Sequence, residues 1–184
     1  MTSAASALDL EAGNFMAVVH IVFGPQGAGK STYARTLAVS SGATRFSIDE
    51  WMAQLYGPDL PEPVELNWLM ERVQRCESQI WRTAEQIAKN GGNVILDLGF
   101  MKARNRSAFA DRARDAGISS ELHYVTAPHD IRRGRVLTRN SEKGETFSFE
   151  VSPAMFDFME KEFEDPTTLE LASATVFNSH IPAA

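Results

Sequence analysis

The feature that most constrains this chain is a glycine-rich segment that follows an apolar run. Residues 18–23 read Val-Val-His-Ile-Val-Phe, and Gly24-Pro-Gln-Gly-Ala-Gly-Lys-Ser-Thr32 follows directly, before a helical pattern. Strand, G-x-x-x-x-G-K-S loop and helix in this order are typical of a phosphate-binding P-loop. Its glycines let consecutive backbone N–H groups turn toward an anion, at the positive end of the helix dipole. The segment predicts a nucleotide site formed by Gly24, Gln26, Gly27, Ala28, Gly29, Lys30, Ser31 and Thr32.

Residues in and beyond this loop suit bound Mg·ATP. Lys30 is expected to reach the β- and γ-phosphates, and the Ser31 hydroxyl is expected to ligate Mg²⁺. Asp97 follows the apolar run 94–96, as a Walker B aspartate does, and is predicted to hold the same ion or its waters. Capping of the next loop is the alternative role of Asp97. Leu98 stands where motor ATPases usually carry a carboxylate that positions water, so transfer to another acceptor is favoured.

Asp49 follows a second predicted strand, at residues 44–48. In a parallel sheet ligands bind outside the carboxyl ends of the strands, so Asp49 is expected to converge with the P-loop and Asp97. We expect its strand to lie next to the P-loop strand. Asp49 is predicted to be the general base that accepts the proton of an acceptor hydroxyl. Glu50 is the alternative base, and capping the helix that begins near Trp51 is the alternative role of Asp49.

A basic helical segment, residues 129–139, precedes a polar loop at 140–148. Arg132, Arg135 and Arg139 share one face of that helix. The position predicts a short lid in which Arg135 or Arg139 clamps the transferring phosphoryl group and Arg135 also contacts the nucleotide. A solvated basic face is the alternative.

Two further residues are candidates for the acceptor side of the site. Arg106, in the basic stretch after the third predicted strand, is expected to orient the acceptor, unless it is a surface charge of its helix. Trp51 is expected to line either the core or the substrate pocket.

Apolar and helical patterns alternate along the chain, which predicts an α/β fold of three layers around a five-stranded parallel sheet. Residues 1–14 are expected to be a flexible leader and residues 15–184 a single domain. No segment is apolar and long enough to cross a bilayer, so a cytoplasmic protein without a membrane partner is expected. The expected strands are 17–23, 44–48, 93–98, 121–126 and 174–178.

The composition excludes some classes of site. A net charge of -6 gives no global attraction to nucleic acid, although a local basic patch could bind it. Cys76 is the only cysteine, so no intrachain disulfide can form, and we expect it in the core. The four histidines show no paired spacing typical of a zinc site, and His20 and His123 are expected to be packed within strands.

Taken together, these residues resemble the small P-loop kinases of the AAA_33 type, related to zeta toxins, chloramphenicol phosphotransferase and the kinase domain of polynucleotide kinase. The resemblance implies an ATP-dependent kinase with a five-stranded parallel sheet, the aspartate after the second strand as base, and a lid arginine over the phosphates. Relatives often carry a polar or charged residue near the final strand, where this chain has Val176-Phe-Asn178, so the adenine contacts stay unassigned. The matching pieces are 24–32, 46–49, 94–100, Arg106, 132–140 and 163–166.

The predicted function is transfer of the γ-phosphoryl group of Mg·ATP to a hydroxyl of a small molecule. Lys30, Asp49 and Arg135 or Arg139 are the predicted catalytic residues. Two alternatives remain: a polynucleotide 5′-hydroxyl or nucleotide-sugar kinase, and an ATPase or switch without an acceptor. The sequence does not indicate an oligomeric state.

Overall fold

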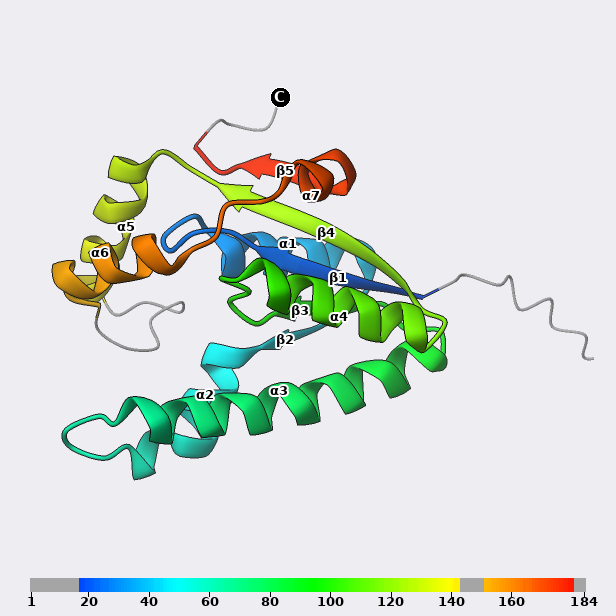
Figure 1. Cartoon of the computed structure of the whole chain (residues 1–184), viewed down its shortest axis with the longest axis horizontal. Helices are drawn as coiled ribbons and strands as arrows, with labels where there is room; N and C mark the ends of the chain where they lie inside the picture. The colour runs from blue at the N-terminus through cyan, green and yellow to red at the C-terminus, as the bar shows by residue number, and fades with distance from the viewer. Residues whose placement is uncertain (1–16, 143–150, 181–184) are drawn as a thin grey trace, which may run out of the picture.

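The structure, a computed structural model, describes residues 17–142 and 151–180. The expected leader, residues 1–14, and most of the expected lid loop lie outside these residues. Five strands form one parallel sheet in the order β2-β3-β1-β4-β5 (Figure 1). The predicted α/β fold is therefore confirmed. The strands are β1 (Val18–Phe23), β2 (Thr44–Ser47), β3 (Val94–Asp97), β4 (Ser119–Thr126) and β5 (Thr175–Asn178).

The helices agree with the expected pattern except toward the carboxyl end. The fifth helix runs to Glu142, three residues past the predicted end at 139. A short helix not expected from the sequence begins at a capping box, in which Thr167 and Glu170 bond each other's backbone N–H groups. The helices are α1 (Lys30–Ser41), α2 (Ile48–Tyr56), α3 (Leu66–Lys89), α4 (Ala103–Asp115), α5 (His129–Glu142), α6 (Pro153–Glu162) and α7 (Thr168–Ser173), and a single 3₁₀ turn spans Gly57–Asp59.

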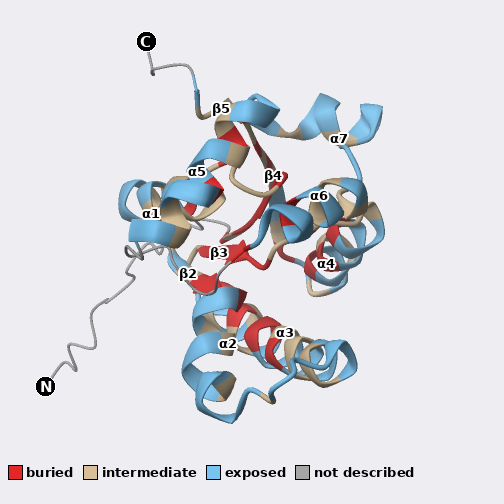
Figure 2. Cartoon of the chain, turned by 90° about the vertical axis from the view of Figure 1, so that its left-hand side faces the viewer, coloured by how far each residue is buried: buried red, intermediate tan, exposed pale blue. Residues whose placement is uncertain are grey.

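The two faces of β1 belong to two different cores. Val19, Ile21 and Phe23 are fully buried in a large cluster with α3 and α4, whereas Val22 packs in a smaller cluster with α1. Figure 2 shows the buried residues concentrated in the strands and on the inner sides of the helices. Burial on both faces explains the nearly continuous apolar run of β1. Cys76 lies in the larger cluster, as expected.

One expectation about the sheet is wrong. The strand before Asp49, β2, pairs with β3 and not with the P-loop strand, and Ser47 stands opposite Asp97 in the register. Asp49 itself lies in the first turn of α2, and the Ser47 side chain caps that helix by accepting a hydrogen bond from the Glu50 N–H. The capping role considered for Asp49 thus belongs to Ser47.

Of the helices within 17–142 and 151–180, none combines the length and the apolar character that a membrane crossing requires.

Candidate active site

The P-loop is held in place by close backbone packing. Gly24 has φ 150°, and a Cβ atom there would lie 2.0 Å from the Val125 carbonyl oxygen at the end of β4. A Cβ at Gly27, with φ 75°, would lie 2.5 Å from the Arg132 carbonyl oxygen on α5. Any side chain at either position would displace the neighbouring backbone. The two glycines are therefore needed to fit the loop against its own protein, even before a phosphate is considered.

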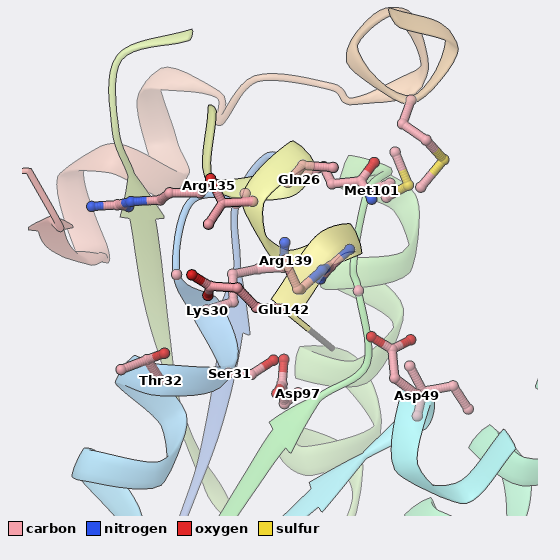
Figure 3. A pocket seen from close by; sticks show the side chains of 18 residues that line it. Gln26, Lys30, Ser31, Thr32, Asp49, Asp97, Met101, Arg135, Arg139 and Glu142 are labelled. Atoms are coloured by element: carbon pink, nitrogen blue, oxygen red, sulfur yellow. The ribbon is translucent and has the colours of Figure 1, made fainter. Parts of the chain in front are cut away.

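The P-loop opens onto a cavity of about 530 Å³. Asp49 reaches this cavity from α2, Asp97 from the end of β3, and Arg135 and Arg139 from α5 (Figure 3). The structure thus brings together eleven residues predicted from the sequence, namely Gly24, Gln26, Gly27, Gly29, Lys30, Ser31, Thr32, Asp49, Asp97, Arg135 and Arg139. Three predicted site residues do not line it: Ala28, Trp51 and Arg106.

Lys30, Ser31 and Asp97, the residues expected to contact phosphates and a metal ion, all line the cavity. The Lys30 ammonium donates to the Pro25 carbonyl oxygen at 3.0 Å. Burial lowers the pKa of Lys30, and the carboxylates of Asp97 and Asp49 work in the opposite direction. The Ser31 hydroxyl and the Asp97 carboxylate point toward each other in Figure 3. Hard oxygen donors of this kind suit Mg²⁺, so the residues present fit the ion that the P-loop implies.

Arg45, on β2, is a site residue that sequence reasoning missed. Its guanidinium donates to the Asp97 Oδ2 atom at 2.9 Å and to the Glu50 Oε1 atom at 2.8 Å. Burial by itself would raise the pKa of Glu50, but hydrogen bonds from Arg45 and Arg35 lower it overall. Glu50 is thus already neutralised by arginines, and it does not line the cavity. It is a poorer proton acceptor than Asp49.

Asp49 is the carboxylate across the cavity from the P-loop. Asp49 is an exposed residue at the cavity wall, and the protein around the cavity partly desolvates its carboxylate. That desolvation raises the pKa of Asp49, the negative charge of Asp97 raises it further, and Lys30, Arg139 and Arg45 act against both. A carboxylate with a raised pKa is a stronger base once ionised, which suits proton abstraction from a hydroxyl.

The three arginines on one face of α5 have different surroundings. Arg132 is buried, donates to the Gln26 carbonyl oxygen at 3.1 Å and forms a bidentate ion pair with Glu160 of α6. Arg135 donates to the Ser179 hydroxyl at 2.7 Å and to the Ser179 carbonyl oxygen at 3.0 Å. Within the part of the chain that the structure describes, the Arg139 Nε atom is buried and has no hydrogen-bond partner. Of the three, Arg139 has the most unused donor capacity.

Arg135 also connects the P-loop to the segment after β5. The Ser179 hydroxyl that Arg135 contacts donates in turn to the Ala28 carbonyl oxygen at 2.7 Å. In Figure 3 the Arg135 side chain extends away from Asp49, whereas Arg139 lies over the middle of the cavity. The two predicted lid arginines therefore face different parts of the site.

The expectation that Arg106 orients the acceptor is contradicted by its position. The side chain is fully buried and pairs with Glu170 of α7, donating to the Oε2 atom at 3.0 Å. It also donates to the carbonyl oxygens of Phe100 and Glu164. These bonds use the donors that an acceptor would need. The surface-charge alternative is wrong as well, because Arg106 is inside the protein.

Trp51 belongs to the core and not to the cavity wall. Its ring packs edge-on against Phe46 with 6.0 Å between the ring centroids, beside the larger cluster. Of the two places considered for Trp51, the structure therefore selects the core.

Several cavity residues were not singled out from the sequence. Thr138 and Glu142 extend the face of Arg135 and Arg139 by helical spacing, so the same pattern could have identified them. Met101 follows Phe100, whose φ of 35° is the one positive value at a non-glycine residue in 17–142 and 151–180. No sequence signal predicts that turn. The remaining cavity residues beyond the predicted set are Ile48, Gly99, Val136 and Met159.

Comparison with known proteins agrees with this geometry. The sequence profile of the AAA_33 family, an AAA domain, matches residues 19–166. The chain belongs to the AAA_33 family. The match spans every cavity-lining residue, from the P-loop to Met159. No curated protein matches the sequence.

Solved structures of several proteins, two of them described as kinases, share the fold of this AAA_33 chain. A provisionally named kinase from Chloroflexus aurantiacus J-10-fl has a TM-score of 0.68 at 17% identity, covering 88% of this chain and 84% of that one. A sugar kinase from Janibacter sp. HTCC2649 has a TM-score of 0.63 at 16% identity, covering 90% and 87%. Kti12 from Chaetomium thermophilum, solved with ADP-AlF3, has a TM-score of 0.62 at 17% identity, covering 86% and 87%. The chain thus has the fold of a small P-loop kinase.

Proposed function

We propose that this protein is an ATP-dependent kinase that transfers the γ-phosphoryl group to a hydroxyl of a small molecule. One observation carries the proposal: a single cavity holds the P-loop with Lys30 on one side and the Asp49 carboxylate on the other, with Asp97 also at its wall. Phosphoryl transfer needs a phosphate cradle, a metal site and a group that positions the nucleophile, all facing one space.

The phosphate side of the cavity supplies binding and charge neutralisation. Backbone N–H groups of the loop and the N-terminus of α1 would hold the β- and γ-phosphates, with the Lys30 ammonium beside them. Ser31 and Asp97 would hold Mg²⁺, which neutralises charge on the phosphates when bound. Arg45 orients Asp97 through its 2.9 Å hydrogen bond. A buried carboxylate fixed in this way needs little reorganisation when the substrate enters.

Asp49 and Arg139 would act on the transferring group. The Asp49 carboxylate accepts the proton of the acceptor hydroxyl and directs its oxygen toward the γ-phosphorus. The guanidinium of Arg139, whose Nε atom is unpartnered among the described residues, stabilises the charge on the transferring phosphoryl group. Arg135 lies toward Ser179 and the outer end of the P-loop. We assign Arg135 to nucleotide binding and Arg139 to catalysis.

The cavity favours a small acceptor over a polynucleotide. Among the described residues, its basic side chains, Lys30, Arg135 and Arg139, are matched by the acidic Asp49, Asp97 and Glu142, so the lining carries no excess of positive charge. Polynucleotide binding depends on an excess of positive charge along the strand. The apolar side chains of Ile48, Met101 and Met159 complete the wall. A small polyhydroxy compound such as a sugar fits this mixture of polar and apolar surface.

The test is a screen for phosphoryl transfer from radiolabelled ATP to sugars, other alcohols, nucleosides and 5′-hydroxyl oligonucleotides. Lys30→Ala is expected to abolish transfer. Asp49→Asn is expected to lower it by about 10²- to 10⁴-fold while ATP binding is retained. Asp59→Asn is the matched control, because Asp59 is exposed in the 3₁₀ turn and does not line the cavity.

Transfer by Asp49→Asn at the parent rate would show that Asp49 is not the base. Phosphate release at the same rate with and without every acceptor would favour the ATPase alternative. Preferential labelling of the oligonucleotide would favour the polynucleotide alternative.

A further inference from the structure

A second polar cluster lies on the face of the sheet that α1 covers. His20 of β1 stands directly opposite Glu121 of β4 in the parallel register, and His123 follows two residues later on β4. Alternation along a strand places these three side chains on the same face of the sheet as Val22, which packs against α1. Both histidines are buried, as expected from the sequence, while Glu121 is exposed. None of the three lines the active-site cavity.

Three potential ligand atoms of this cluster converge on one point. The His20 Nδ1 atom lies 3.0 Å from the His123 Nε2 atom and 3.4 Å from the Glu121 Oε2 atom. The third separation, between His123 Nε2 and Glu121 Oε2, is 3.7 Å. Zn²⁺ bonds to nitrogen and oxygen at about 2.0–2.2 Å in tetrahedral geometry, which places neighbouring ligand atoms about 3.3–3.6 Å apart. The three observed separations bracket that value.

We propose that His20, Glu121 and His123 form a binding site for one divalent transition-metal ion, with Zn²⁺ the ion that the donor set fits best. Two imidazole nitrogens and one carboxylate oxygen are a recurrent set of protein ligands for Zn²⁺, with water in the fourth position. The site is separate from the Mg²⁺ site of the active centre and does not depend on the proposed kinase activity.

A contact from α1 also supports a metal site at this cluster. The Tyr33 hydroxyl lies 2.8 Å from the His123 Nδ1 atom, the ring nitrogen that points away from the cluster. Metal-ligating histidines usually donate their second ring N–H to an oxygen, which fixes the tautomer and the ring orientation. Tyr33 is itself held by Phe177, with 4.9 Å between the ring centroids. The second contact that a ligating His123 requires is therefore already built.

An ion can reach the cluster from solvent. β5 pairs with β4 only from His123 onward. Glu121, before that point and exposed, gives an ion a route from solvent.

The sequence could not show this site because its ligands are far apart in the chain. His20 and His123 are separated by 103 positions, and only the β1–β4 pairing brings them together. The proposal therefore departs from the expectation, based on spacing, that the chain has no zinc site.

The test is titration of the full-length protein with Zn²⁺ by calorimetry and with Co²⁺ by visible absorption, which reports tetrahedral coordination. One equivalent of metal is expected to bind. Glu121→Gln removes the carboxylate ligand and is expected to weaken binding at least about 10-fold, and Tyr33→Phe by about 10-fold. His123→Asn is expected to abolish it. His129→Asn is the control, because His129 is exposed and lies outside the cluster.

Glu121→Gln tests metal binding by the cluster even if His123→Asn fails to fold, because an exposed side chain can be changed without disturbing the core. The proposal is overturned if Zn²⁺ does not bind, or if Glu121→Gln and Tyr33→Phe bind it as tightly as the parent protein. Loss of binding on His129→Asn would also overturn it, because the metal would then lie elsewhere.

Discussion

Arg106 is a buried cation whose charge is balanced inside the protein. It has no exposed surface, and its ion pair with Glu170 ties α4 to the start of α7. The Glu170 carboxylate also accepts the Thr167 N–H in the capping box. Removing one member of such a pair leaves the other as an uncompensated buried charge, which costs more than the pair itself contributes.

Glu170→Gln is therefore expected to lower the free energy of unfolding at pH 7 by about 2 kcal/mol. The hydrogen bond from Arg106 is the main cause that holds the pKa of Glu170 below 4.5. A lowered carboxyl pKa stabilises the fold above the unfolded value, and that stability is lost as the pH falls through the folded pKa. Urea denaturation should thus show the difference between parent and variant narrowing below pH 4.5.

Glu85→Gln provides the matched control for this measurement. Glu85 pairs with Lys89 one turn away on the surface of α3. Exposed pairs of this kind contribute roughly 0.5 kcal/mol or less, so Glu85→Gln should leave the unfolding curve almost unchanged. If the two substitutions lowered the free energy of unfolding equally, the buried ion pair of Arg106 would contribute no more to stability than an exposed one.

Residue type alone does not distinguish the structural roles of the arginines in this chain. Helical spacing correctly places Arg132, Arg135 and Arg139 on one face of α5, yet their surroundings differ. The first is buried against Glu160, the second lines the cavity while bonded to Ser179, and the third lines the cavity with its Nε atom unpartnered among the described residues. Their roles depend on α6 and on the segment after β5, which meet α5 only in the folded chain. Arg45 was missed for the same reason, because its partner Asp97 lies on another strand.

At the scale of the element, the P-loop is a turn fitted tightly between β4 and α5. The overlaps that a side chain would cause at Gly24 and Gly27 are with backbone atoms, which cannot swing aside. The G-x-x-x-x-G-K-S pattern predicted the strand, the loop and the helix correctly, since that pattern is local in the sequence; that the loop binds nucleotide stays a prediction. It did not predict that the loop also packs against the backbones of β4 and α5, because these two elements come from distant parts of the sequence.

Gly24→Ala is consequently expected to destabilise the protein without any nucleotide by about 3 kcal/mol, from steric overlap and from strain at positive φ. Gly134→Ala is the control, since Gly134 is exposed within α5 and has open space around it. Alanine there should stabilise the helix by about 0.5–1 kcal/mol. Thermal unfolding of the unliganded proteins measures both. An unchanged melting temperature for Gly24→Ala would mean that glycine is needed at this position only for ligand binding and not for packing of the loop.

At the scale of the whole molecule, the order of the strands determines where the cavity walls lie. Alternating apolar and helical patterns predicted five parallel strands, and the structure contains them. They did not predict that β3 separates β1 from β2, because each crossover can place its next strand on either side of the sheet. Asp97, at the end of β3, consequently lies between the P-loop after β1 and Asp49 after β2 in the order of the strands across the sheet. Asp49 reaches the cavity from α2.

This arrangement predicts that nucleotide and acceptor stabilise different walls of one site. Mg·ADP at about 100 times its dissociation constant should stabilise the parent protein by about 2.7 kcal/mol. For a chain of 184 residues, that corresponds to a rise in melting temperature of roughly 5–10 °C. Lys30→Ala should lose most of the rise, whereas Asp49→Asn should keep it, because we assign Asp49 to the acceptor and not to the nucleotide. Differential scanning fluorimetry with and without Mg·ADP measures all three proteins, and an equal rise in Lys30→Ala would place the nucleotide outside the P-loop.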